Sequence, residues 1–454
     1  MNMINTAYSG LQTAQMGMNV TAMNVANMLT PGYSRQGIVQ SAVGPYGTAQ
    51  VGNGVQVDSI RRISSQYLVS QVWHTSSQAS YYQINQQYFS ALEQVIGNDS
   101  TSISNGLDDF FSALSELTTQ PESPALRQQF LNQSRALATR FNNTQDMINS
   151  QRTSINSQRD ATVSQVNTLT TGIAEYNQKI AAMESAGGNS SVLRDQRDEL
   201  VRELSLLTEV NVVEDSQGYY NVSMKSGQPL VSGTTAGQMS SSRDENGLPV
   251  LSLQFADHHF PLPPSPGGQL GALYDYETGT LNAMETAQQG MAEALAQQVN
   301  EQLAQGYDLN GNPGKPLFSF DPGNPAGMLQ VNTLSPDELA LSGAPAEPGN
   351  GDNLQFLLAI QEKKMDLPGL GNMSLAEGSA AMVSTLGIAS RNNQTELTAS
   401  LTILEQALQQ RDNLSAVNQD EEAINLQIYM QAYQSNMKVI SAGNQLFSDL
   451  LGLF

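Results

Sequence analysis

The residue types that most often carry out catalysis or bind metals are scarce in this chain. Its 454 residues include no cysteine, which excludes disulfides, thiolate chemistry and Cys-ligated zinc or iron–sulfur sites. The histidines are His74, His258 and His259. His258 and His259 follow a predicted strand, where neighbouring side chains point to opposite faces, so they form a poor chelating pair. We therefore predict no catalytic, cofactor-binding or metal-binding residue, and no enzyme.

One segment resembles the opening of a calcium-binding loop, namely Asp308-Leu309-Asn310-Gly311-Asn312. Pro313 then occupies the position that requires glycine, and the twelfth position is Ser319 rather than glutamate. We predict a tight Asx-rich turn here instead of a metal site.

A charged cluster, Asp195-Gln196-Arg197-Asp198-Glu199, lies in a predicted helix. Charged residues three and four positions apart on a helix commonly pair along an exposed face. We predict such a solvated face, and no binding site.

The first 35 residues carry an apolar stripe with helical spacing. The stripe consists of Ile4, Leu11, Met18 and Val25, widened by Tyr8, Ala22 and Leu29. No charged residue occurs before Arg35, and an uncharged polar face suits burial against other chains. The stripe stops at Thr30-Pro31-Gly32-Tyr33, where Pro-Gly fits the centre of a type II turn.

The C-terminal stretch mirrors this pattern. Its stripe consists of Leu426, Tyr433, Ile440 and Phe447, again seven residues apart. From Ala423 onward the only charged residues are Lys438 and Asp449. Two charge-poor, heptad-patterned ends predict a coiled coil of N- and C-terminal helices, with the two stripes as an assembly interface. The alternative is that each end packs on its own domain as a core helix.

Short motifs at both ends carry a family resemblance. Near the N-terminus, the chain resembles the signature of flagellar rod, hook and hook-associated proteins. The matching residues are Asn27, Thr30, Pro31, Gly32 and Tyr33, followed by Ser34-Arg35-Gln36. The C-terminal signature is similar to Gln431, Ala432 and Tyr433, preceded by Asp420-Glu421-Glu422. Residues 34–36, 195–199 and 227–233 resemble the hook-associated member at the hook–filament junction most.

The resemblance implies a structural subunit of the bacterial flagellum that joins hook to filament and is needed for filament assembly. It implies self-assembly into an axial ring, contacts with hook protein and a neighbouring hook-associated protein, and an export chaperone that binds the C-terminal helix. It also implies an extracellular location, reached through the flagellar type III export apparatus without a cleaved signal. The termini would form the inner tube, the helical bundle the next layer, and the β insertion would face outwards.

The composition limits other functions. The formal charge is −22, yet only 14% of residues are charged, against about 25% in typical domains. Nucleic-acid binding requires a basic footprint, which this acidic chain lacks. We expect no membrane insertion, because no apolar run is long enough to span a bilayer, and no secretory signal.

Periodicity along the chain predicts a mainly α fold with inserted β structure. Helical spacing breaks off and returns twice, so the bundle is discontinuous. The predicted domains are a terminal coiled coil (1–35 plus 414–454), a β-hairpin linker (36–63), a helical bundle (64–208, 269–305 and 374–413), a small β domain (209–268), and a segment that is either a second β module or ordered loop (306–373).

Two other functions stay open at this point. A hook or rod subunit of the same family would share the terminal signatures. An enzyme or ligand-binding module on a helical stalk would need a convergent polar pocket, which the sequence does not offer.

Overall fold

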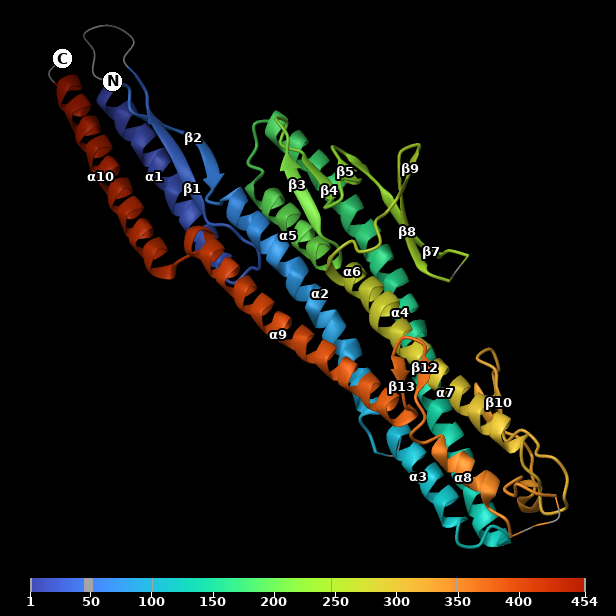
Figure 1. The fold of residues 1–454 in the computed structure, drawn as a ribbon. Helices are drawn as coiled ribbons and strands as arrows, with labels where there is room; N and C mark the ends of the chain where they lie inside the picture. Colours follow the sequence, from blue (N-terminus) through green and yellow to red (C-terminus); the bar gives the residue numbers. More distant parts are fainter. Residues whose placement is uncertain are drawn as a thin grey trace.

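The computed structural model describes residues 2–44, 52–99, 101–245, 247–345, 347 and 349–452. It shows an elongated, mainly helical molecule with several small antiparallel sheets, which confirms the predicted fold class (Figure 1). Within these residues no helix is both long and apolar enough to cross a membrane.

The N- and C-terminal helices lie side by side at one end of the molecule (Figure 1). Helix α1 (Asn2–Ala26) and helix α10 (Gln419–Leu451) run antiparallel. A hairpin of β1 (Gln36–Ala42) and β2 (Val55–Arg62) packs along α1 within the predicted hairpin linker, of which residues 45–51 lie outside the described residues. Helix α10 begins after Asn418, whose side chain accepts the first free N–H groups of the helix.

The helical bundle is built from separated stretches of chain. Its helices are α2 (Gln66–Ile96), α3 (Ile103–Glu116), α4 (Pro124–Ser185), α5 (Ser191–Leu207), α6 (Gly268–Asp275), α7 (Asn282–Leu303) and α9 (Leu375–Ser415). A π-helical turn, Tyr276–Leu281, joins α6 to α7. Phe141, Ile148 and Ile155, seven residues apart on α4, face the core and are fully buried.

In the described residues between α5 and α6, the strands form two sheets rather than one. The four-stranded sheet contains β3 (Val210–Glu214), β4 (Tyr220–Met224), β5 (Pro229–Ser232) and β6 (Thr235–Ala236). The three-stranded sheet contains β7 (Gln238–Arg243), β8 (Pro249–Phe255) and β9 (His258–Pro261). Both rest against α4.

The segment at 306–373 combines ordered loop with short strand pairs. Its elements are the hairpin of β10 (Phe318–Phe320) and β11 (Leu329–Val331), helix α8 (Asp352–Ala359), and the hairpin of β12 (Met365–Leu367) and β13 (Gly371–Met373). The predicted Asx turn is confirmed, because Asp308 Oδ1 accepts the N–H groups of Asn310 and Asn312, each at 2.8 Å.

Asparagine side chains attach strands to helices. Asn177 of α4 accepts the N–H of Tyr220 at 3.0 Å and donates to its C=O at 2.9 Å, as a neighbouring strand would. Four more pairs in the described structure repeat this geometry: Asn24 with Gln36, Asn142 with Leu329, Asn167 with Met239, and Asn300 with Phe318. Because one side chain satisfies both backbone groups of one residue, each pair fixes where a strand lies along its helix.

Replacing Asn142 by alanine should lower the free energy of unfolding by about 1–3 kcal/mol, because the backbone N–H and C=O of buried Leu329 lose their partner. Asn143→Ala, at the exposed next position of α4, is the control. Both variants gain helix propensity equally, so the difference between them isolates the lost contact. Urea denaturation measures it, and equal stabilities would contradict a docking role for Asn142.

Candidate functional site

Helices α1 and α10 meet through small residues. Gly10 faces Asn436, Gly17 faces Tyr429, and Gly443 faces Ile4. A methyl group added at Gly17 would lie 2.6 Å from the Tyr429 ring, so the ring or the helices would have to move apart to accept one. The seven-residue spacing of Gly10 and Gly17 is the signal in the sequence that could have located this seam.

Apart from Ile4, which packs against Gly443, the predicted stripes flank the seam instead of filling it. Met18 follows Gly17 by one position and Met430 follows Tyr429 by one position, so in an antiparallel pair both turn to the same side of the seam. Ile4, Leu11, Met18, Tyr433 and Ile440 are half-buried, whereas Val25, Leu426 and Phe447 are exposed. The structure therefore brings both stripes to one side but leaves much of their apolar surface open.

We define the terminal apolar surface as the exposed large apolar side chains of α1, the turn after it, and α10. Its members are Met3, Tyr8, Met16, Met23, Val25, Met28 and Leu29, with Ile424, Leu426, Ile428, Met430, Met437, Val439, Leu446, Phe447, Leu450 and Leu451. Helix α1 has no charged residue, and α10 after Ala423 has only Lys438 and Asp449. Exposed apolar surface on this scale, almost free of charge, is of the kind that proteins use to bind other molecules.

The signature turn after α1 is the predicted type II turn. The Tyr33 N–H donates to Thr30 O at 3.2 Å, and Gly32 between them has a φ of +76°, which favours glycine. The Tyr33 hydroxyl donates to Asn24 at 2.9 Å. Burial, together with the nearby carboxylates Asp195 and Glu422, raises the pKa of Tyr33 to about 12, so the hydroxyl keeps its proton.

The other signature residues lie around these elements. Asn27 accepts a hydrogen bond from the Thr30 hydroxyl at 3.3 Å, and Pro31 is exposed. On α10, Gln431 is exposed, and Ala432 is half-buried beside Tyr433.

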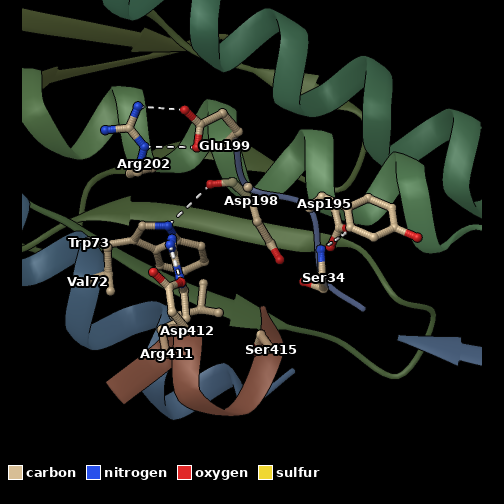
Figure 2. A pocket seen from close by; sticks show the side chains of 13 residues that line it. Ser34, Val72, Trp73, Asp195, Asp198, Glu199, Arg202, Arg411, Asp412 and Ser415 are labelled. Atoms are coloured by element: carbon tan, nitrogen blue, oxygen red, sulfur yellow. Dashed lines mark hydrogen bonds and ion pairs between the residues drawn. The ribbon is translucent and has the colours of Figure 1, made fainter. Parts of the chain in front are cut away.

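The charged cluster at 195–199 is not an exposed face, so that prediction was wrong. Asp195 and Arg197 are buried, and Arg62 at the end of β2 lies between Asp195 and Asp198. The Arg62 Nη1 atom is 3.1 Å from Asp195 Oδ1 and 2.5 Å from Asp198 Oδ2. The backbone N–H of Ser34 donates to Asp195 at 3.0 Å (Figure 2). The signature turn and β2 cover this face of α5, which periodicity within α5 does not reveal.

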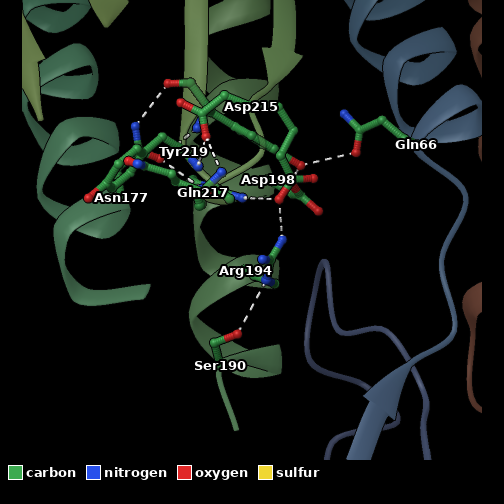
Figure 3. Close-up of polar contacts among 12 residues, drawn as sticks. Gln66, Asn177, Ser190, Arg194, Asp198, Asp215, Gln217 and Tyr219 are labelled. Atoms are coloured by element: carbon green, nitrogen blue, oxygen red, sulfur yellow. Dashed lines mark hydrogen bonds and ion pairs between the residues drawn. The ribbon is translucent and has the colours of Figure 1, made fainter. Parts of the chain in front are cut away.

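Arg197 ties the same cluster to the four-stranded sheet. Its Nη1 atom donates to Asn177 at 2.8 Å and to Gly218 O at 2.7 Å, and its guanidinium lies 3.5 Å from the centre of the Tyr220 ring. The Tyr220 hydroxyl donates to Asp198 at 2.6 Å; Figure 3 shows the polar contacts around Asn177 and Asp198. Burial raises the pKa of Asp195 and lowers the pKa of Arg197.

Arg35 connects the same turn to the end of the bundle. Its backbone N–H donates to Ser415 O at the end of α9, and its C=O accepts the N–H of Ile63, each at 2.8 Å. Its side chain pairs with Glu421 in the first turn of α10 at 2.5 Å. We call Ser34, Arg35, Arg62, Asp195 and Asp198 the polar joint, because they link the terminal helices to the bundle.

The polar joint is built for holding chain segments together. Its cavity of about 40 Å³ has room for water but not for a substrate. In the segments that the structure describes, no group of three or more acidic or histidine side chains is placed to hold a metal ion. His258 and His259 are exposed on β9, and His74 lies 3.1 Å from Glu209.

Three family models match the chain. The model of the flagellar hook-associated protein FlgK helical domain matches residues 89–318. The model of the flagella basal body rod protein matches residues 4–33, and that of the flagellar basal body rod FlgEFG protein C-terminal matches residues 408–453. The two shorter ranges contain the terminal signatures.

Full-length relatives agree with these models. The flagellar hook-associated protein 1 of Salmonella typhimurium is 26% identical, and the match covers 100% of both chains. The protein of that name from Bacillus subtilis is 24% identical over 99% of this chain and 97% of its own. The solved structure of the flagellar hook junction protein FlgK from Burkholderia pseudomallei shares the fold, with a TM-score of 0.67 and 17% identity over 76% of this chain and 99% of that one.

Replacing Arg62 by glutamine should lower the free energy of unfolding by about 3–5 kcal/mol, because two carboxylates stay buried without their cation. Arg61→Gln, at the exposed neighbouring position, should cost less than about 0.5 kcal/mol. Since burial already raises the pKa of Asp195, the deficit should be smallest in acid and grow as pH rises through that raised value. Urea denaturation at several pH values measures this loss in the free energy of unfolding. An equal loss in both variants would contradict the role of Arg62 in the polar joint.

Proposed function

The chain belongs to the FlgK family of flagellar hook-associated proteins and is a structural protein of the hook–filament junction, and we propose that it assembles there through its terminal apolar surface. The observation that supports this proposal best is the exposure of apolar side chains on both terminal helices. The family match over residues 89–318 argues against the hook or rod alternative.

The energetics favour burial of this surface against other subunits. Each large apolar side chain gains about 1.5–3 kcal/mol when fully buried. The ten such side chains exposed on α10 still have 38% to 63% of their surface open, so completing their burial offers about half of that for each, on the order of 7–15 kcal/mol in total, before the entropic cost of association. The lack of charge on α1 means that few ions must be stripped of water when copies pack together.

In this proposal the termini, 1–35 plus 414–454, form an inner tube of an axial ring of copies. The helical bundle forms the next layer, and the β structure at 209–268 faces outwards. The stripe residues Ile4, Leu11, Met18, Val25, Leu426, Tyr433, Ile440 and Phe447 lie in contacts between subunits. The polar joint gives each terminal pair the same direction relative to its bundle, which a regular ring requires.

The proposed partners follow from the same position in the flagellum. They are further copies of the chain, hook protein on one side, and a neighbouring hook-associated protein on the other. We propose that the subunit works outside the cell, leaves through the flagellar type III apparatus without a cleaved signal, and has no catalytic role. An export chaperone would cover α10 beforehand, because an apolar surface of this size aggregates when left bare.

Phe447→Asp should leave the monomer folded and stop assembly. Phe447 is 60% exposed, so the change should shift the free energy of unfolding by less than about 0.5 kcal/mol, whereas a carboxylate buried between subunits costs several kcal/mol. The readout is electron microscopy of hook-terminated flagella, from cells lacking this subunit, after addition of the purified protein.

The matched control for Phe447 is Phe356→Asp. Phe356 is 62% exposed on α8, at the far end of the molecule (Figure 1). We expect this variant to assemble like the parent. Normal assembly of Phe447→Asp would exclude the terminal apolar surface as the assembly element.

A variant that lacks residues 419–454 should lose its export chaperone, because α10 supplies the apolar surface that the chaperone covers. A variant that lacks residues 2–26 keeps α10 and should retain the chaperone. Co-purification from the producing cells distinguishes them. Equal recovery of a bound chaperone with both variants would place its site elsewhere on the chain.

A further inference from the structure

Methionines are divided unevenly between the two parts of the molecule. In the described residues, the exposed methionines of the terminal part are Met3, Met16, Met23, Met28, Met430 and Met437, with 37% to 47% of each side chain open to solvent. Elsewhere in these residues Met183 alone is exposed to that degree, at 42%. The core methionines, by contrast, include Met224, Met239, Met284, Met291, Met328 and Met382, each at most 5% exposed.

The exposed methionines of the terminal part lie on both sides of the seam. Met430 and Met437 are seven residues apart on α10 and share the side of the predicted stripes. Met16 precedes the seam residue Gly17 by one position and so turns to the other side, and Met23 follows Met16 by seven residues on α1. Met16 lines a groove with Val55 and Val57 of the hairpin. Methionine therefore contributes to the terminal apolar surface wherever a neighbouring subunit could contact it.

The thioether is the one apolar side-chain group that mild oxidants convert directly into a polar one. A peroxide transfers one oxygen to the sulfur: the S–O bond forms from a sulfur lone pair and the O–O bond breaks. Methionine is oxidised by two electrons, and hydrogen peroxide is reduced to water. The sulfoxide oxygen is a strong hydrogen-bond acceptor, and burying it without a donor is costly.

We propose that Met3, Met16, Met23, Met28, Met430 and Met437 are sites of oxidative modification that control whether the subunit can assemble. This inference rests on the proposed function. Peroxide that reaches a free subunit forms sulfoxides on the terminal apolar surface, which must lose its water when subunits pack together. The oxidised subunit then no longer joins the ring. Incorporated subunits bury the same thioethers and are protected. The fold itself withstands oxidation, because its core methionines are shielded.

The test uses the full-length protein treated with hydrogen peroxide, cleared with catalase, and added to hook-terminated flagella from cells that lack this subunit. Peptide mass spectrometry measures the sulfoxide at each methionine. We expect sulfoxides at the six terminal positions and at Met183, an unchanged circular dichroism spectrum, and a loss of assembly of about tenfold or more. Incorporated subunits given the same peroxide should stay unoxidised at the six positions.

Two variants locate the effect. A variant with leucine at all six terminal positions has no oxidisable sulfur there, and whatever assembly it shows before peroxide it should keep after peroxide. Met183→Leu should lose assembly after peroxide as the parent does. Repair of the oxidised parent by methionine sulfoxide reductases, one for each epimer, should restore assembly.

Several results would overturn the inference. If the oxidised parent assembles normally while Phe447→Asp does not, the oxidation proposal is wrong and the proposed function stands. If both assemble normally, the terminal apolar surface is not the assembly element and both proposals fall. Equal inhibition of the leucine variant by peroxide also refutes the proposal. If that variant fails to assemble even before peroxide, the repair experiment decides. The proposal is then refuted if the reductases do not restore assembly of the oxidised parent.

Discussion

The burial of Asp195 and Asp198 against Arg62 positions the terminal helices relative to the rest of the molecule. Moving carboxylates and a guanidinium out of water costs several kcal/mol per ion, and only a geometry that pairs them closely offsets that cost. Arg62 ends β2, and Ser34, which donates to Asp195, follows α1 through the signature turn. The direction in which the chain leaves the bundle is therefore set by contacts that tolerate little displacement.

The same use of polar contacts recurs where strands meet helices. On α4, Asn142, Asn167 and Asn177 each satisfy both backbone groups of one strand residue. Apolar packing supplies most of the stabilisation of such a fold, but it is weakly directional. A carboxamide that must bond to one N–H and one C=O selects a single register. In this molecule, apolar contacts hold the layers together and polar contacts decide how they are aligned.

The two kinds of surface suit an assembling protein. The chain carries a formal charge of −22, yet α1 has no charged residue and α10 after Ala423 has two. Net charge keeps free subunits apart in solution, while the charge-poor end can be buried against other copies at low desolvation cost. The seam of Gly10, Gly17 and Gly443 supports this division, because small residues let the helices approach closely and leave the large side chains for external contacts.

The sequence by itself determined the elements and the family. Seven-residue spacing located the terminal helices, Pro31-Gly32 located the turn, and alternation located several strands, because these signals depend on neighbours close along the chain. Only the tertiary structure decided which faces are buried. Asp195 pairs with Arg62, which is 133 residues away in the sequence. The local sequence of α5 therefore predicted a solvated face, whereas in the folded chain β2 covers it. The spacing of Leu11 and Tyr433 predicted that their stripes form the contact between the two terminal helices. In the structure, Gly10, Gly17 and Gly443 lie at that contact. An apolar stripe has the same period whether it packs within its own chain or against another subunit. Whether its side chains are buried depends on which segments the tertiary structure places against it.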